Sequence, residues 1–97
     1  MISLKFHPEA YAELLASAMY YEKQQKKLGK RFLEAFEHTI HQVRIMPKIY
    51  QKITQNIRRC CIYNFPYGIV FREKERLIEI IAVIPFRKKP GYWKSRV

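Results

Sequence analysis

The fold of this chain follows from one aliphatic run, LIEIIAVI, at residues Leu77–Ile84. Glu79 is the one polar residue in it, and the others are aliphatic. A strand that is apolar on both faces lies inside a sheet whose two faces are both covered. The run therefore predicts an interior strand, and the rest of the chain has to supply a covering for each face.

The first covering is a predicted pair of helices. Pro8 and Glu9 suit the first turn of a helix, because Pro needs no hydrogen-bond acceptor there and Glu complements the dipole. Apolar residues then recur at helical spacing in two segments separated by Gly29, and the second segment stops at Pro47. We expect an antiparallel hairpin joined at Gly29. Its predicted apolar stripes are Tyr11, Leu14, Leu15, Ala18, Tyr21 and Leu28, then Phe32, Leu33, Phe36, Ile40 and Val43.

Three further strands are predicted from alternation and β-propensity, at Ile2–Phe6, Ile57–Asn64 and Tyr67–Arg72, with a turn at Glu73–Glu75. The expected order is β-α-α-β-β-β within a single domain over residues 1–97. This is an α+β fold in which the helical hairpin packs on a small, largely antiparallel four-stranded sheet.

The second covering has to come from the C-terminal segment, where Pro90, Tyr92 and Trp93 are available. A large aromatic side chain in such a segment either packs on the sheet or contacts a target. The sequence leaves both roles open for Tyr92 and Trp93.

The charge of the chain is strongly one-sided. The chain has nineteen Lys and Arg residues and eight acidic residues, all of them Glu, which gives a net charge of +11. Residues 56–97 hold 10 of the basic residues and only 3 of the acidic ones. A field of this sign attracts nucleic acid, anionic lipid or an acidic protein. With 48% hydrophobic residues the chain is not a disordered basic tail.

Cysteine usage and hydropathy predict a cytoplasmic protein. Cys60 and Cys61 are neighbours, so in a strand they point to opposite faces and do not form an ordinary disulfide. The N-terminus lacks the apolar run of a signal peptide, and no stretch approaches the roughly 20 apolar residues of a membrane helix. We therefore expect no membrane association.

Two polar clusters on the predicted helices are interpreted as solvated surface. Glu34, Glu37, His38 and His41 have spacings at which side chains can share a metal, but no second cluster completes a ligand set. The basic residues around Gly29 complement helix termini. The sequence predicts no metal and no cofactor, and a buried Cys60 or Cys61 behaves as a small hydrophobe.

The candidate site is a set of cations spread over several strands, with an aromatic side chain close by. Such a set suits a phosphodiester or a row of acidic side chains. If it were catalytic, the reaction would be RNA cleavage by the 2′-hydroxyl, with Arg stabilising the phosphate and Tyr or Lys moving the proton. The set consists of Arg58, Arg59, Arg72, Arg87, Lys88, Lys89, Tyr92, Lys94 and Arg96.

Several segments, in this order along the whole chain, resemble the RelE/ParE family of toxins. They are His7-Pro8-Glu9-Ala10, Tyr20-Tyr21-Glu22, Leu28-Gly29-Lys30-Arg31-Phe32-Leu33, Pro47, Ile57-Arg58-Arg59, Phe65-Pro66-Tyr67 and the closing Arg87-Lys88-Lys89-Pro90-Gly91-Tyr92-Trp93-Lys94-Ser95-Arg96. The resemblance implies the toxin of a bacterial type II toxin–antitoxin module, also called a plasmid stabilization protein. It also implies an acidic antitoxin that wraps around the domain in a hetero-oligomeric complex.

The family has two kinds of target. RelE-like members cut mRNA in the ribosomal A site, and ParE-like members poison DNA gyrase. The resemblance assigns the catalytic roles of a ribonuclease member to Arg59, Arg87 and Tyr92. However, Gly68 stands where such members have an Arg, and Cys61 stands where they have a second Lys. Arg72, on the same predicted strand as Gly68, is an alternative source of the missing cation.

Losing one phosphate-stabilising cation costs orders of magnitude in rate. The sequence therefore favours a ParE-like, non-nuclease toxin over a ribosome-dependent mRNA endoribonuclease. A non-toxic basic nucleic-acid-binding module is a third hypothesis. It is the least favoured, because the interleaved stacking aromatics of an RNA platform are missing. For either toxin, the predicted surface for the target or the antitoxin is the cationic set without Lys94.

Overall fold

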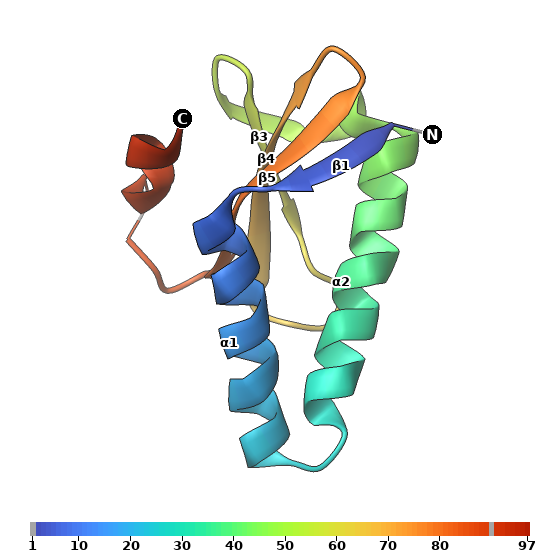
Figure 1. Cartoon of the computed structure of the whole chain (residues 1–97), viewed down its shortest axis with the longest axis vertical. Coiled ribbons are helices and arrows are strands. Elements are labelled where there is room, and N and C mark those ends of the chain that lie inside the picture. Colours follow the sequence, from blue (N-terminus) through green and yellow to red (C-terminus); the bar gives the residue numbers. More distant parts are fainter. Residues whose placement is uncertain (1, 90) are drawn as a thin grey trace.

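A computed structural model describes residues 2–89 and 91–97 of the chain (Figure 1). No helix in this part of the chain is long and apolar enough to cross a membrane. The elements in chain order are β1 (Ser3–Phe6), α1 (Pro8–Gln24), α2 (Leu28–Ile45), the short 3₁₀ helix η1 (Pro47–Ile49), β2 (Gln51–Thr54), β3 (Ile57–Cys61), β4 (Tyr67–Lys74), β5 (Leu77–Pro85) and a second 3₁₀ helix, η2 (Tyr92–Arg96).

The strands form one sheet in the order β1-β5-β4-β3-β2. β5 is an interior strand, as the aliphatic run predicts. It pairs in parallel with β1 and antiparallel with β4, and the remaining pairs are antiparallel. The prediction of four strands was wrong by one, because it missed β2. Its sequence, QKIT, has no alternation, and all four residues are exposed at the sheet edge.

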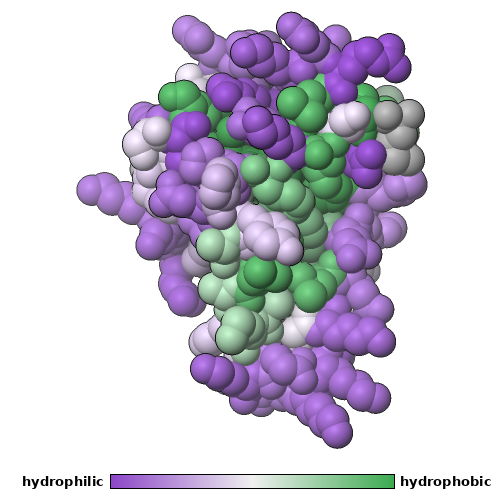
Figure 2. Space-filling model, in the orientation of Figure 1, coloured by the Kyte–Doolittle hydropathy of each residue, from purple (hydrophilic) through white to green (hydrophobic). Residues whose placement is uncertain are grey.

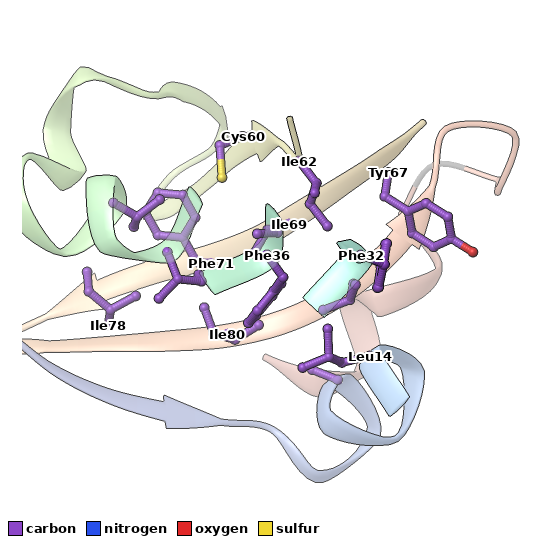
Figure 3. Close-up of a cluster of buried hydrophobic side chains, with 14 of the residues drawn as sticks. Leu14, Phe32, Phe36, Cys60, Ile62, Tyr67, Ile69, Phe71, Ile78 and Ile80 are labelled. Carbon is purple, nitrogen blue, oxygen red and sulfur yellow. The ribbon is translucent and has the colours of Figure 1, made fainter. Parts of the chain in front are cut away.

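The helical hairpin covers one face of the sheet, here called the helix face. Figure 3 shows this core, in which Phe32 and Phe36 of α2 and Leu14 of α1 lie against Phe71 and Ile80 of the sheet. All five side chains are buried. The predicted apolar stripe of the second helix is confirmed, and His7 caps the first helix by accepting a hydrogen bond from the backbone N–H of Glu9 at Nδ1.

The expectation that the hairpin turns at Gly29 was wrong. The turn lies before it, where Lys27 has a φ of 71°, and Gly29 is the second residue of α2. The Glu22 carboxylate accepts hydrogen bonds from the backbone N–H groups of Lys27 and Gly29, and so caps the start of α2. The glycine is needed for close approach of the two helices, because a Cβ there would lie 2.4 Å from the Ala18 carbonyl oxygen.

The predicted stripe of α1 is only partly buried. Leu14 and Ala18 are in the core and Tyr21 packs against it, but Tyr11 and Leu15 are 50% and 41% exposed, so their placement in the core was wrong. The apolar residues of α1 extend around more of the helix than the sheet can cover. Figure 2 shows an apolar band down the middle of one side of the molecule, framed by hydrophilic side chains. The exposed apolar residues of α1, called the α1 outer face below, are Tyr11, Ala12, Leu15, Ala16, Met19 and Tyr20.

The other face of the sheet, called the open face, is covered by the C-terminal strap, residues 91–97. The strap and α2 lie on opposite sides of the sheet (Figure 1). Trp93 is 4% exposed and packs in a cluster with Val70, Ala82 and Ile84. The predicted second covering is therefore confirmed for Trp93, and Tyr92 packs against the same cluster. Pro90 lies outside the described residues.

A β-bulge in β5 changes which of its residues lie on each face of the sheet. The register with β4 shifts between Val70 and Phe71, which pair with Ala82 and Ile80, so Ile81 is an extra residue. Ile80 accordingly joins the helix-face core, and Ile81 joins the cluster on the open face. Beyond Ile80 the strand also loses β1 as a neighbour, since the pairing of β1 ends there.

Candidate functional site

A hollow of about 390 Å³ lies on the open face of the sheet, between β2 and the strap. Its floor is formed by Gly68, Val70 and Ile84, and Ile53 of β2 forms one side. The opposite side consists of Lys88, Gly91, Trp93 and Lys94, with Phe86 at the end. This hollow is called the groove below. It combines an apolar floor with cationic walls, which suits an anionic or acidic ligand that also has apolar groups.

Arg59 is the cation in the floor of the groove. It lies on β3 opposite Val70, and its side chain is on the open face. Its guanidinium carbon is 5.9 Å from the centre of the Phe86 ring, at the distance of a cation–π contact. Gly68 lies beside it, and a Cβ there would be in ordinary contact, 3.5 Å from Arg59 Cδ. The backbone at Gly68 therefore leaves room for a side chain, and the absence of one widens the groove.

Two of the predicted cations have protein partners instead. Arg58 is on the other face of β3 and donates hydrogen bonds from Nη1 to the carbonyl oxygens of Lys48 and Tyr50, at 3.3 and 2.7 Å. Arg72 pairs across the sheet with Glu79, with a distance of 2.7 Å between Nε and Oε1. Both side chains hold local structure together.

Arg96 and Tyr92 converge on Glu13 of α1. The Arg96 side chain is only 7% exposed and donates to Glu13 through Nη1 and Nη2, at 2.9 and 2.8 Å. The Tyr92 hydroxyl donates to Glu13 Oε2, and the Val83 backbone N–H donates to Oε1 at 3.0 Å. Burial raises the pKa of Glu13, but the hydrogen bonds from Arg96, Tyr92 and Val83 outweigh it, so the pKa lies below its ordinary value. Burial and the bond to Glu13 raise the pKa of Tyr92.

The remaining cations lie after β5 and do not share one site. Lys88 is at the groove wall, with Nζ 5.1 Å from the centre of the Tyr92 ring. Arg87 lines a separate hollow together with Tyr20, Tyr21 and Phe86. Lys89 is exposed. The structure therefore brings Arg59, Lys88 and Lys94 together at the groove and places Arg87 in a different hollow. The Tyr92 ring lies against Lys88, but its hydroxyl is directed to Glu13.

The cysteines and histidines are the other candidate groups in the sequence. Cys60 is buried in the helix-face core, and this burial, together with Cys61, raises its pKa to about 12. A thiol with that pKa is not a nucleophile near neutral pH. No three His, Cys, Asp or Glu side chains in residues 2–89 and 91–97 are placed to hold a metal ion.

Sequence reasoning missed three parts of this site. Glu13 was not singled out, because nothing local marks a helix residue whose partner is 83 positions away. Phe86 was missed because it lies just after β5 and outside any predicted strand. Ile53 was missed because it belongs to the edge strand β2, which was not predicted. The pattern of exposed aromatic and cationic residues after Ile84 was the one available signal for Phe86.

Comparison with solved structures shows the fold. A chromosomal ParDE toxin–antitoxin system from P. aeruginosa matches with a TM-score of 0.62 and 22% identity, over 88% of this chain and 96% of that chain. The isolated E. coli RelE toxin matches with a TM-score of 0.62 and 12% identity, over 98% of this chain and 95% of that chain. No curated protein matches. The chain therefore has the RelE/ParE-like fold.

The family assignment is narrower than the fold. Residues 4–90 match the family model described as the ParE toxin of the type II toxin–antitoxin system parDE. The chain belongs to this family. The resemblance seen in the sequence is thereby confirmed at the level of the family, and the matching family model is that of ParE.

Proposed function

We propose that this chain is a growth-arresting toxin that acts on DNA gyrase in the manner of ParE, and that an acidic antitoxin neutralises it. Membership of the ParE toxin family supports the general class. The proposed target and the antitoxin rest on the arguments that follow.

The observation that carries the choice of target is the dispersal of the residues a ribonuclease would need. Arg59 lies in the groove, whereas Arg87 lines a different hollow and the Tyr92 hydroxyl is bonded to Glu13. A general acid or base has to reach the substrate and have a pKa near the working pH. Tyr92 meets neither condition, since its pKa is raised and its proton is donated within the protein. With Gly68 in the floor, the groove suits binding better than phosphodiester cleavage.

Two features support an acidic antitoxin as partner. The net charge of +11 favours an acidic protein and disfavours a second copy of this chain. The α1 outer face is apolar at positions i, i+4 and i+8, and Met19, near its C-terminal end, is 62% exposed. A contiguous exposed apolar surface of this kind marks a protein interaction site. An amphipathic helix with acidic flanks fits both the apolar face and the surrounding charge.

The target is tested with purified protein, purified gyrase and relaxed plasmid DNA. We expect supercoiling to be inhibited and covalent gyrase–DNA complexes to accumulate, while ribosome-bound message stays intact in a translation reaction. Unchanged supercoiling together with translation-dependent mRNA cleavage would reverse the assignment in favour of a ribonuclease. Normal growth of cells that express the chain alone, with neither effect, would leave the nucleic-acid-binding hypothesis.

A further inference from the structure

Among the residues that the structure describes, no strand pairs with the outer edge of β5 beyond Ile80. The bulge at Ile81 changes which backbone groups point to the side that β1 has left. The Ile81 carbonyl and the Val83 N–H lie on this side, and each is bonded to a side chain. Arg96 Nη1 donates to the Ile81 oxygen at 3.0 Å, and Glu13 Oε1 accepts from the Val83 N–H at 3.0 Å. The Glu13–Arg96 pair thus occupies the place of the missing strand.

The same pair fixes the far end of the strap. Trp93 attaches the strap to the sheet through apolar contacts, and Arg96 attaches it through two hydrogen bonds to Glu13. Tyr92 adds a third bond to the same carboxylate. Between these attachments lies Lys94, whose side chain is free to line the groove. The groove wall therefore depends on a helix residue that does not itself line the groove.

We propose that Glu13 is a positioning residue for the groove: it holds the strap so that Trp93 and Lys94 form the wall that contacts the target. The part of this inference that concerns target binding rests on the proposed function. The part that concerns the strap rests on the contacts of Glu13 alone.

Arg96 depends mainly on Glu13 and much less on the neighbouring carboxylate of Glu9. Glu9, one helical turn earlier, comes within 3.5 Å of Arg96 Nε, but its side chain is 65% exposed. Its end of the pair is open to solvent, and a contact at that distance with a solvated carboxylate contributes little. Glu13 is 24% exposed and satisfies Arg96, Tyr92 and Val83 together. Removing Glu13 leaves the buried Arg96 charge without its partner, which is strongly unfavourable for the closed strap.

The test compares Glu13→Gln with Glu9→Gln, a matched control on the same helix that makes the same change in charge. Trp93 is the one tryptophan in the chain, so its fluorescence reports the strap directly. For Glu13→Gln we expect a red-shifted emission maximum, a several-fold increase in quenching by acrylamide and an unchanged far-UV circular dichroism spectrum. Inhibition of gyrase supercoiling should fall at least tenfold. The Glu9→Gln variant should behave as the wild type in all of these measurements.

A second variant guards against loss of the fold. Arg96→Gln breaks the same pair from the side of the strap and leaves α1 intact, so it should give the same red shift and the same loss of inhibition. The proposal is overturned if Trp93 stays shielded in both variants, or if Trp93 becomes exposed and inhibition persists in full. If the wild-type chain does not inhibit gyrase, the proposed function fails, and the fluorescence comparison still decides whether Glu13 holds the strap.

Discussion

Gly29 of α2 faces the backbone carbonyl of Ala18 on α1 so closely that a Cβ at residue 29 would lie 2.4 Å from that oxygen. Backbone atoms cannot move away as a flexible side chain can. The contact therefore fixes the distance between the two helices at the closed end of the hairpin.

A Gly29→Ala substitution should lower the free energy of unfolding by about 1–3 kcal/mol, because the added methyl group overpacks the helix contact. Urea unfolding followed by circular dichroism measures the change. Gly68→Ala is the matched control, since its Cβ would meet its nearest atoms at 3.5 Å and the strand gains from losing a glycine. Equal stabilities for the two variants would contradict the close-contact argument.

The attachment of the strap should depend on pH at both ends of the range. The pKa of Glu13 is lowered on folding from its ordinary value of 4.5, so its contribution is complete above that value and is lost as the pH falls through the folded pKa. The pKa of Tyr92 is raised from 10.0, so its contribution is present below pH 10 and is lost as the pH rises further. Trp93 emission should be constant between these limits and shift to the red outside them. An acid transition that persists unchanged in Glu13→Gln would assign it to another carboxylate.

Loss of the Arg59 side chain should weaken inhibition of the target more than loss of another single positive charge elsewhere on the surface. Replacing it with Gln removes a cation from the groove floor, where a charge-assisted hydrogen bond is worth about 1.5–3 kcal/mol, or roughly a ten- to hundredfold loss of inhibition. Arg31→Gln lowers the net charge equally on the exposed surface of α2 and should cost much less. Titration of the two variants against gyrase supercoiling compares them. Similar losses would show that the overall field, and not the groove, governs binding.

The α1 outer face should be needed for neutralisation and not for toxicity. Leu15→Glu or Met19→Glu places a carboxylate in the apolar face, which we expect to abolish rescue of growth by the co-expressed antitoxin while growth arrest persists. Neither change should unfold the protein, because both positions are exposed. Ile49→Glu makes the same kind of change at a 65% exposed position on η1 and should leave neutralisation intact. Full rescue of both α1 variants would place the antitoxin elsewhere.

Introducing an arginine at residue 68 should not turn the protein into a ribonuclease. The Cβ of such a residue fits at van der Waals distance, so Gly68→Arg should fold and add a cation to the groove. Message bound to ribosomes should nevertheless remain uncut, since Tyr92 stays bonded to Glu13 and Arg87 faces another hollow. Primer extension on a translated message detects the cut sites. Cleavage by this variant would mean that the missing cation alone separates the two activities.

The fold was largely predictable because β5 has an unambiguous composition. A run with seven aliphatic residues in eight excludes an exposed face, and the requirement for two coverings led directly to the hairpin and to Trp93. The bulge at Ile81 was not predictable for the same reason. When every position is apolar, no alternation remains from which a shift of one residue could be detected.

The candidate site was less predictable than the fold, because the sequence does not show which basic side chains are paired within the protein. Arg58, Arg72 and Arg96 look the same in sequence as Arg59, yet three of the four are engaged with groups of the protein. The partner of Arg96 is the extreme case, since it belongs to the first helix. Whether a cation is available to a ligand depends on tertiary contacts that residue type and spacing do not encode.

Glu13 and Arg96 are 83 positions apart in the sequence, so their contact closes a loop that contains most of the chain. The loop closed by this pair contains α2 and the strands β2 to β5. Contacts between distant positions form late, because a long loop has to close first. The groove wall should therefore form late during folding, as should the pairing of β1 with β5, so a partly folded chain would lack the surface proposed to contact the target.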